Sequence, residues 1–237
     1  MTPERSARLQ AVLARRQPDL TLITDFVNKQ RNLSAIVRNC DAAGVMQVHA
    51  VLGEEDYRTY RGTAMGSHRW VDVLHYRCAS EAIAALRRQN HQVYAAHLSD
   101  DACDYRDIDY CQPTALLFGA ERRGVSETAL AAVDGCITVP MVGMVESFNV
   151  SVASGIILAE AQRQRTLAGL YARCRIDQAT RQRLLFEWAY PQLRIYCEQR
   201  GLAYPPIDDA GELIDPSGWY ASVQIQTAEI ATNKDML

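Results

Sequence analysis

The chain has 237 residues, of which 48% are hydrophobic and 22% charged, so it can bury a full core and is longer than most single α/β domains need. No apolar run reaches the roughly 18 residues of a membrane span, and the opening MTPERSARLQAVLARRQ is charged and amphipathic rather than signal-like. We therefore expect a cytoplasmic protein, outside membranes, with one main domain and extensions.

The seven cysteines are scattered, form no CxxC pair and lie mostly in apolar segments. Zinc sites need ligands at characteristic short spacings, which this chain does not supply. We expect buried free thiols in a reducing compartment, and no metal site.

The net charge of −3 is unevenly distributed. Residues 161–200 hold eight arginines against three acids (8 − 3 = +5), whereas residues 81–160 hold five against eleven (5 − 11 = −6). All basic residues except Lys29 and Lys234 are arginines, whose forked donors suit phosphate. Charge alone leaves two readings open, a phosphate-binding zone or a solvated helix face.

The first half of the chain alternates strand-like and helix-like segments. Residues 3–16 form an arginine-bearing helix, and residues 32–44 form a helix that Asn32 or Ser34 caps and Gly44 ends. A further helix is expected at 79–90, and strands are expected at 19–27, 45–52, 70–76 and 92–98.

The second half begins with a polar, acid-rich connection at 99–113 and continues the alternation. We expect strands at the starts of TALLFGAERRGVS (114–126) and at CITVP (136–140), with helices at 126–133 and 150–165. After residue 166 the strand signal stops, and a helical stretch is followed by the turn-rich 202–220. This order predicts a mostly parallel α/β sheet with helices on both faces. The domains would be 1–18, 19–165 and 166–237, the outer two being helical extensions.

Parallel sheets bind ligands at the carboxyl ends of their strands, where this chain carries three polar or glycine-bearing segments. They are NLSAIVR (32–38), FGAERRGVS (118–126) and VPMVGMVESFNVSVASGIIL (139–158). No GxGxxG follows a strand, and GAERRG lacks the GK[ST] of a phosphate loop. Both common nucleotide folds are therefore disfavoured.

The three segments, in this order and spacing, resemble the motifs of the knotted ribose 2′-O-methyltransferases of the SPOUT superfamily. RQPDLT, RQRLLFEWAYP and GLAYPPIDDAGELIDPSGWY further resemble the bacterial tRNA (guanosine-18-2′-O)-methyltransferase subgroup, so the resemblance covers nearly the whole chain. Glu146 and Phe148 depart from the QSLN that relatives often carry. The resemblance implies a deep C-terminal trefoil knot, an exception to normal connectivity that sequence physics alone would not predict.

The resemblance also implies that S-adenosylmethionine binds in the knot. Pro140 closes a strand, Gly143 permits a tight turn, and Ser147 or Asn149 can cap the next helix. The implied cofactor-binding residues are Ala96, Gly119, Val139, Met141, Met144 and Phe148. Apolar walls with few polar anchors suit a cofactor, although these side chains could equally be ordinary core.

Methyl transfer to a ribose hydroxyl requires alignment and removal of a proton, and needs no metal. The family's polar positions fall here on Asn32, Arg38, Glu121, Ser147 and Asn149. Relatives are described as activating the hydroxyl with the arginine that matches Arg38. A guanidinium is a poor base, so anchoring a phosphate accounts for part of its role. Alternatives remain: a surface ion pair for Arg38, a solvated Glu121, and plain helix caps for the asparagines.

The family forms homodimers with pockets that draw on both subunits. Val150, Ala153, Ile157 and Ala161 have the spacing to face a second copy, or to be core. For tRNA docking we expect Arg8, Arg15, Arg16, Arg163 and Arg165 to contact phosphates. Trp188, Tyr190, Trp219 and Tyr220 could stack on bases, but packing of the tail is the favoured reading.

Together these features predict methylation of the ribose 2′-oxygen of guanosine 18 in tRNA. The same chemistry on another tRNA position or on ribosomal RNA is the nearest alternative. A non-catalytic knotted RNA-binding protein is disfavoured by the intact polar positions, and a nicotinamide oxidoreductase by the missing glycine fingerprint.

Overall fold

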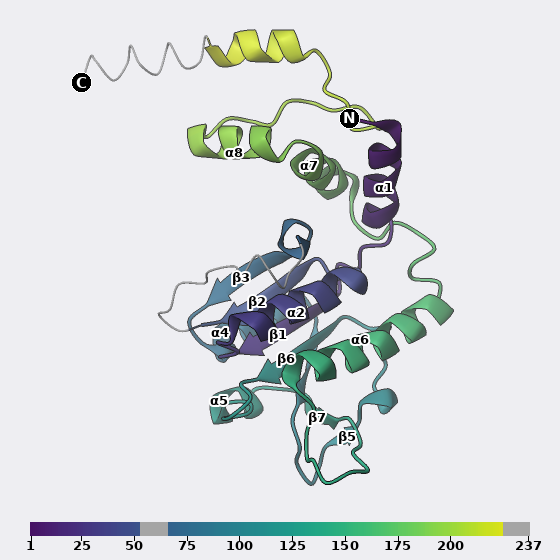
Figure 1. The fold of residues 1–237 in the computed structure, drawn as a ribbon, viewed down its shortest axis with the longest axis vertical. Helices are drawn as coiled ribbons and strands as arrows, with labels where there is room; N and C mark the ends of the chain where they lie inside the picture. The colour runs from purple at the N-terminus through teal and green to yellow at the C-terminus, as the bar shows by residue number, and fades with distance from the viewer. Residues whose placement is uncertain (53–65, 225–237) are drawn as a thin grey trace, which may run out of the picture. The chain divides into compact units, whose positions relative to one another are not determined.

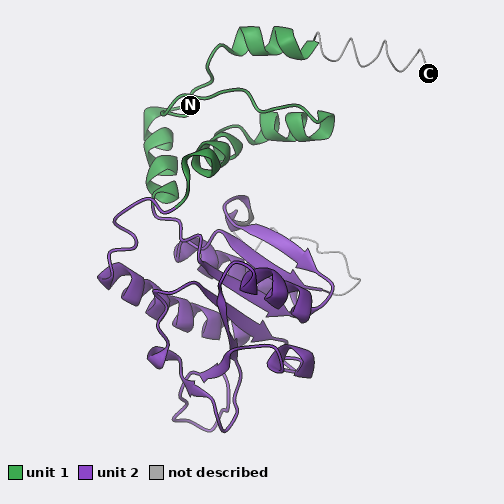
Figure 2. Cartoon of the chain, turned by 180° about the vertical axis from the view of Figure 1, so that it is seen from behind, with its two compact units in different colours: residues 1–14, 176–237 green, residues 15–175 purple. Residues whose placement is uncertain are grey.

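A computed structural model describes residues 1–52 and 66–224 (Figure 1). The chain divides into two compact units, one made of Met1–Ala14 with Ile176–Leu237 and the other of Arg15–Arg175 (Figure 2). The N-terminal helix and the C-terminal extension therefore belong to the same unit, rather than forming separate additions at 1–18 and 166–237.

The larger unit is built on a seven-stranded sheet in which neighbouring strands run parallel throughout the described residues. Its spatial order is β3-β2-β1-β6-β4-β7-β5. The strands are β1 (Leu20–Asp25), β2 (Gln47–Val51), β3 (Asp72–Tyr76), β4 (Gln92–Ala96), β5 (Cys103–Asp104), β6 (Thr114–Gly119) and β7 (Gly135–Thr138). The expected α/β class is confirmed. The short edge strand β5 lies in the acid-rich connection, where no alternating apolar pattern in the sequence indicates a strand.

Helices cover both faces of this sheet, as predicted. Along β1 and β6, alternate side chains enter two separate hydrophobic clusters because successive strand residues point to opposite faces. Leu22 and Phe118 pack with α2 (Gln30–Ala42) and α6 (Val150–Leu167), while Ile23 and Leu117 pack with α4 (Ala79–Arg87) and α5 (Glu127–Leu130). The central strands are therefore apolar on both sides, which explains their continuous hydrophobic runs.

Helix α2 starts earlier than its sequence suggests. It begins at Gln30 with Lys29 in the capping position, so the prediction that Asn32 or Ser34 caps it is wrong. Both residues lie inside the first turns, and the Asn32 side chain is left to reach another loop. The other end is as predicted, since Gly44 has φ 78° just after the helix and an added Cβ would meet the Arg15 carbonyl oxygen at 2.8 Å.

Helix α6 follows a loop without regular structure at residues 139–149. Asn149 caps it, with its Oδ1 accepting hydrogen bonds from the Ser151 backbone N–H at 2.9 Å and the Ser151 hydroxyl at 2.6 Å. The predicted cap is confirmed for Asn149. Asn39 of α2 donates to the Ser151 carbonyl at 2.7 Å and to Ser154 Oγ at 3.0 Å, which fixes α6 against α2.

The apolar face of α6 is core of its own chain. Val150, Ile157 and Ala161 are buried in the cluster with Leu22 and Phe118, and Ala153 packs against that cluster. The reading of this face as a contact with a second copy is therefore wrong, and the alternative reading as core is right. Cys40 is also buried here and Cys197 is buried elsewhere, as expected for the thiols, whereas Cys174 is exposed.

The smaller unit is helical. It contains α1 (Pro3–Leu13), α7 (Gln178–Ala189), α8 (Pro191–Arg200) and a helix at 216–224 that the turn-rich reading of 202–220 missed. The Met1 amino group pairs with Glu212 at 2.9 Å, and Arg5 Nη2 donates to the Trp188 carbonyl at 3.2 Å, so the two ends of the chain are tied together within this unit.

Candidate active site

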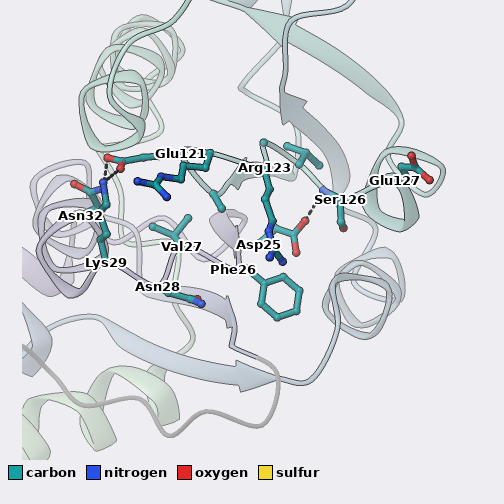
Figure 3. A pocket seen from close by; sticks show the side chains of 14 residues that line it. Asp25, Phe26, Val27, Asn28, Lys29, Asn32, Glu121, Arg123, Ser126 and Glu127 are labelled. Carbon is teal, nitrogen blue, oxygen red and sulfur yellow. Dashed lines mark hydrogen bonds and ion pairs between the residues drawn. The ribbon is translucent and has the colours of Figure 1, made fainter.

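Two cavities adjoin at the carboxyl edge of the sheet. The larger, of about 720 Å³, lies between residues 25–32 and 120–127 (Figure 3). The smaller, of about 480 Å³, lies between the ends of β4, β6 and β7 and the start of α6. Both are lined by Ala120, Glu121 and Gly124, so the loop after β6 separates them. Their position agrees with the rule that parallel sheets bind ligands beyond the carboxyl ends of strands.

Glu121 joins three segments at the boundary between the cavities. Its Oε1 accepts from Asn32 Nδ2 at 2.6 Å and from Asn149 Nδ2 at 2.7 Å, and its Oε2 pairs with Lys29 Nζ (Figure 3 shows the contacts with Asn32 and Lys29). Asn32, Glu121 and Asn149 are among the predicted catalytic residues, and the structure brings these three together. We call Lys29, Asn32, Glu121 and Asn149 the Glu121 cluster.

Lys29 was missed from the sequence. It is one of only two lysines in the chain and comes four positions after the end of β1, which is the signal that could have singled it out. The side chain is 68% exposed, whereas that of Glu121 is 25% exposed. A partly sheltered carboxylate with a cation and two amides is held in place more firmly than a solvated loop glutamate.

The glycines of GAERRG fold the loop that carries Glu121. An added Cβ on Gly119 would lie 2.1 Å from the Gly124 carbonyl carbon, so the loop closes on itself only with glycine there. Gly124 has φ 65° and its N–H donates to the Ala120 carbonyl at 2.8 Å. This tight turn places residues 121–123 at the larger cavity and Glu121 at both cavities.

The predicted cofactor residues divide into two groups. Ala96, Gly119, Val139 and Phe148 line the smaller cavity, together with Ser147. Met141 and Met144 are not among its lining residues, and Met144 is 100% exposed. Within the described chain these two methionines therefore do not line this cavity, and their contact with a cofactor stays a prediction.

The loop that closes the smaller cavity has unused backbone groups. Residues 140–148 make no backbone–backbone hydrogen bond with the described part of the chain, and Glu146, Ser147 and Phe148 of this stretch line the cavity. Backbone N–H and C=O groups require partners, so such a loop can offer donors and acceptors to a heterocycle. Apolar walls beside free backbone groups fit an adenosine-containing cofactor.

Arg38 stands apart from the Glu121 cluster. It is exposed on α2 and lines neither cavity. The separation of six positions from Asn32 to Arg38 corresponds to about 9 Å along a helix and a rotation of about 240°. Within one chain, the structure therefore does not bring Arg38 to the other predicted catalytic residues.

Two of the predicted phosphate contacts are buried. Arg165 is 0% exposed, and its guanidinium donates to Asp19 Oδ1 at 2.7 Å and to the Tyr110 carbonyl at 2.8 Å. Arg16 is 0% exposed and pairs with Asp41 at 2.7 Å. The prediction of phosphate contacts is wrong for both, because their donors face protein groups inside the fold.

Arg8, Arg15 and Arg163 are exposed and remain candidates for phosphate contacts. Arg163 pairs with Glu160 at 2.7 Å, and its hydrogen bond lowers the pKa of that carboxyl group. Trp188 is buried, as the packing interpretation expected, whereas Tyr220 is exposed beside Trp219.

The larger unit is thus a parallel α/β domain with two adjoining cavities at the carboxyl edge of its sheet and a carboxylate held between them, which is where such sheets bind ligands. Sequence models identify the family. The SpoU rRNA Methylase family matches residues 19–159, and the C-terminal model of SpoU rRNA methylases matches residues 163–216. The chain belongs to the SpoU methylase family.

Individual relatives share most of the chain. A tRNA (guanosine(18)-2'-O)-methyltransferase of Escherichia coli strain K12 is 48% identical over 226 residues, which is 94% of this chain and 99% of that protein. The crystal structure of the A. aeolicus TrmH/SpoU tRNA modifying enzyme superposes with a TM-score of 0.76 at 39% identity, covering 80% of this chain and 97% of the other. An AdoMet-bound rRNA methyltransferase from Sinorhizobium meliloti superposes with a TM-score of 0.55 at 30% identity, over 65% of this chain and 59% of the other.

Within the described residues, no helix is long and apolar enough to cross a membrane. No group of three or more histidines, cysteines and acids among them is arranged to hold a metal ion.

Proposed function

We propose that this protein transfers a methyl group from S-adenosylmethionine to the ribose 2′-oxygen of guanosine 18 in tRNA, in the cytoplasm. The full-length similarity to an enzyme of that name supports the substrate. The observation that carries the proposal is the Glu121 cluster, which lies where a cofactor cavity and a substrate cavity meet.

The smaller cavity fits the cofactor. Ala96, Val139 and Phe148 supply apolar walls, and the 140–148 backbone supplies free donors and acceptors. Gly119 lets the β6 loop pass without a side chain that would obstruct the turn. When bound, S-adenosylmethionine supplies an electrophilic methyl group.

The Glu121 cluster positions the ribose beside that cavity. Asn32 and Asn149 are held by Glu121, and Asn149 is also fixed by capping α6, so their amides are oriented before substrate arrives. Such preorganisation aligns the attacking oxygen without further ordering. Ser147, which lines the smaller cavity, is a further contact for the ligand.

We assign Arg38 to the site of a second copy in a homodimer. It lines neither cavity of its own chain, and the neighbouring loop exposes Val142, Met144 and Val145. Exposed apolar side chains of this kind mark an interaction surface. From the partner's site, the Arg38 guanidinium would hold a substrate phosphate and orient the hydroxyl, since a guanidinium offers hydrogen-bond donors and no acceptor.

The proposal includes the trefoil knot. β7 lies beyond β4 in the sheet, yet α6 packs on α2, which follows β1 on the far side of β6. The chain after β7 must therefore return across the carboxyl ends of β4 and β6. Passage through an earlier loop at this edge would produce the bent 139–149 backbone and fix it as a cofactor cradle.

Incubation with labelled S-adenosylmethionine and an unmodified tRNA transcript, followed by nucleoside mapping, tests this function. We expect 2′-O-methylguanosine at position 18. Methylation of a ribose in ribosomal RNA or at another tRNA position would contradict the proposed substrate but not the proposed reaction. Methylation of a base would contradict the reaction itself.

A further inference from the structure

The larger cavity is lined by the carboxylate of Asp25, and only one of its two oxygens accepts a hydrogen bond in the described structure. Asp25, at the end of β1, is 1% exposed, and its Oδ2 accepts from the Ser126 backbone N–H at 2.8 Å. Its Oδ1 is buried and has no hydrogen-bond partner in the described structure. One oxygen is enough to hold the 126 loop, so the fold does not explain why the second acceptor is left without a donor.

A strained aromatic residue stands next to it. Phe26 has φ 53°, which is unusual for a bulky residue, and its ring remains 39% exposed while it lines the same cavity. Its N–H donates to the Val51 carbonyl at 3.0 Å, which holds the strained backbone in place. Figure 3 shows Asp25, Phe26 and Arg123 among the residues that line this cavity. Strain of this kind at a cavity wall is a recognised sign of function.

We propose that this cavity binds the guanine base of the substrate nucleoside, with Asp25 accepting from N1–H and the 2-amino group and Phe26 stacking on the ring. This inference rests on the proposed function and adds the residues that select the base.

Hydrogen-bond chemistry favours guanine over the other bases. A carboxylate only accepts, so it pairs best with two adjacent donors. Guanine presents N1–H and a 2-amino group side by side, whereas adenine and cytosine present a donor beside a ring acceptor. A planar ring exposed beside the carboxylate offers a stacking surface, as aromatic side chains do for unstacked RNA bases.

The position of the cavity agrees with this use. Both cavities meet at Glu121, so a base in the larger one leaves its ribose beside the Glu121 cluster and facing the cofactor cavity. Lys29, Arg122 and Arg123 at the same cavity can receive the flanking phosphates. Arg123 is exposed on a loop, so its side chain can move aside when the base reaches Asp25.

The test compares tRNA transcripts that carry guanosine, inosine or adenosine at position 18. Inosine lacks only the 2-amino group. For the wild-type enzyme we expect kcat/KM to fall about ten- to a hundredfold with inosine, the usual effect of losing a hydrogen bond to a charged group. Equal rates on guanosine and inosine would overturn the proposal, and this arm requires no variant to fold.

The variant arm uses Asp25→Asn, which can keep its oxygen toward the Ser126 N–H and then turns an amide donor toward the base. We expect a loss of at least about tenfold in kcat/KM on guanosine 18 and a smaller preference for guanosine over adenosine. Phe26→Leu should raise KM with little change in kcat. An unchanged base preference in Asp25→Asn would contradict the proposal.

Asp134→Asn is the matched control, because Asp134 also accepts a backbone N–H, that of Val93 at 2.8 Å, but lies at the start of β7 away from both cavities. It should keep the wild-type base preference. Cofactor affinity, measured by calorimetry, should be unchanged in Asp25→Asn. A wild-type enzyme that methylates no guanosine 18 would instead refute the proposed function, so the two failures are distinguishable.

Discussion

Carboxylates lie at both ends of strand β1, but those at the two ends differ in how fully their oxygens are hydrogen-bonded within the described chain. At the amino end, Asp19 accepts from the buried Arg165 at 2.7 Å and from Arg175 at 2.5 and 2.7 Å, so both of its oxygens are satisfied. At the carboxyl end, Asp25 keeps one oxygen unpaired and Glu121 stands between two cavities. Satisfied buried charge at one end fixes the fold, and incompletely satisfied polar groups at the other end are available to ligands.

Replacing Glu121 should produce the largest effect. Glu121→Gln removes the negative charge and replaces one of the two acceptor oxygens with an N–H₂, so either Lys29 or the two asparagines face a donor instead of an acceptor. We expect kcat/KM for tRNA methylation to fall at least about a hundredfold, with the melting temperature within a few degrees of wild type. The exposed Glu81→Gln on α4 is the control. Full activity in Glu121→Gln would break the assignment of the carboxyl end to function.

Replacing Asp19 should lower the stability of the protein and leave its activity nearly unchanged, the reverse of the effects expected for Glu121. Asp19→Asn leaves the fully buried Arg165 without its counter-charge, and removing one partner of a buried pair costs about 3 kcal/mol. Urea unfolding measures this loss, while kcat of the folded protein should stay near wild type. The Asp104–Arg106 pair, in which the Arg106 side chain is 60% exposed, is the contrast, and Asp104→Asn should leave unfolding nearly unchanged. Comparable stability in both variants would contradict the structural role of Asp19.

Acid should lower the free energy of unfolding through His49, which lies on β2 beside β1. Burial, and to a smaller extent His91, lowers the pKa of His49 to about 4, from an ordinary value of 6.5. Below pH 6.5 His49 of the unfolded chain binds a proton, whereas His49 of the folded chain stays neutral until about pH 4. The free energy of unfolding is therefore highest above pH 6.5 and declines as the pH falls toward 4. We expect His49 to account for a loss of about 2 kcal/mol at pH 5. Urea unfolding of His49→Asn should show a flatter decline over this window, and an unchanged decline would contradict the assignment.

The surface arginines should give the smallest effects. Arg8→Ala, Arg15→Ala and Arg163→Ala should each weaken tRNA binding a few-fold and reduce the slope of log affinity against log salt by about one. Arg88→Ala, also exposed, is the matched control. An unchanged salt slope in all three variants would remove these residues from the docking surface.

The sequence predicted the architecture well for a physical reason. Apolar runs such as that of β1 are required by a strand that is buried on both faces, and glycine at position 44 is required by a positive φ. The start of α2 was misplaced because a capping asparagine and an asparagine that reaches Glu121 from within a helix look alike in sequence.

The site was predicted only in part. Asn32, Glu121 and Asn149 meet as the family motifs implied, but arginines give no sign in sequence of whether their charge is buried. Arg165 faces inward on α6 while Arg163 faces outward, and only the packing of α6 distinguishes them. Asp25 and Phe26 escaped notice because an unpaired oxygen and a strained φ belong to the folded chain.

The most direct test of the account is the position of the methyl group. Labelled cofactor, an unmodified tRNA transcript and the wild-type protein should yield label in 2′-O-methylguanosine at position 18, at an initial rate at least about a hundredfold lower when Glu121→Gln replaces the wild type. Label in a base, or undiminished label with Glu121→Gln, would contradict it.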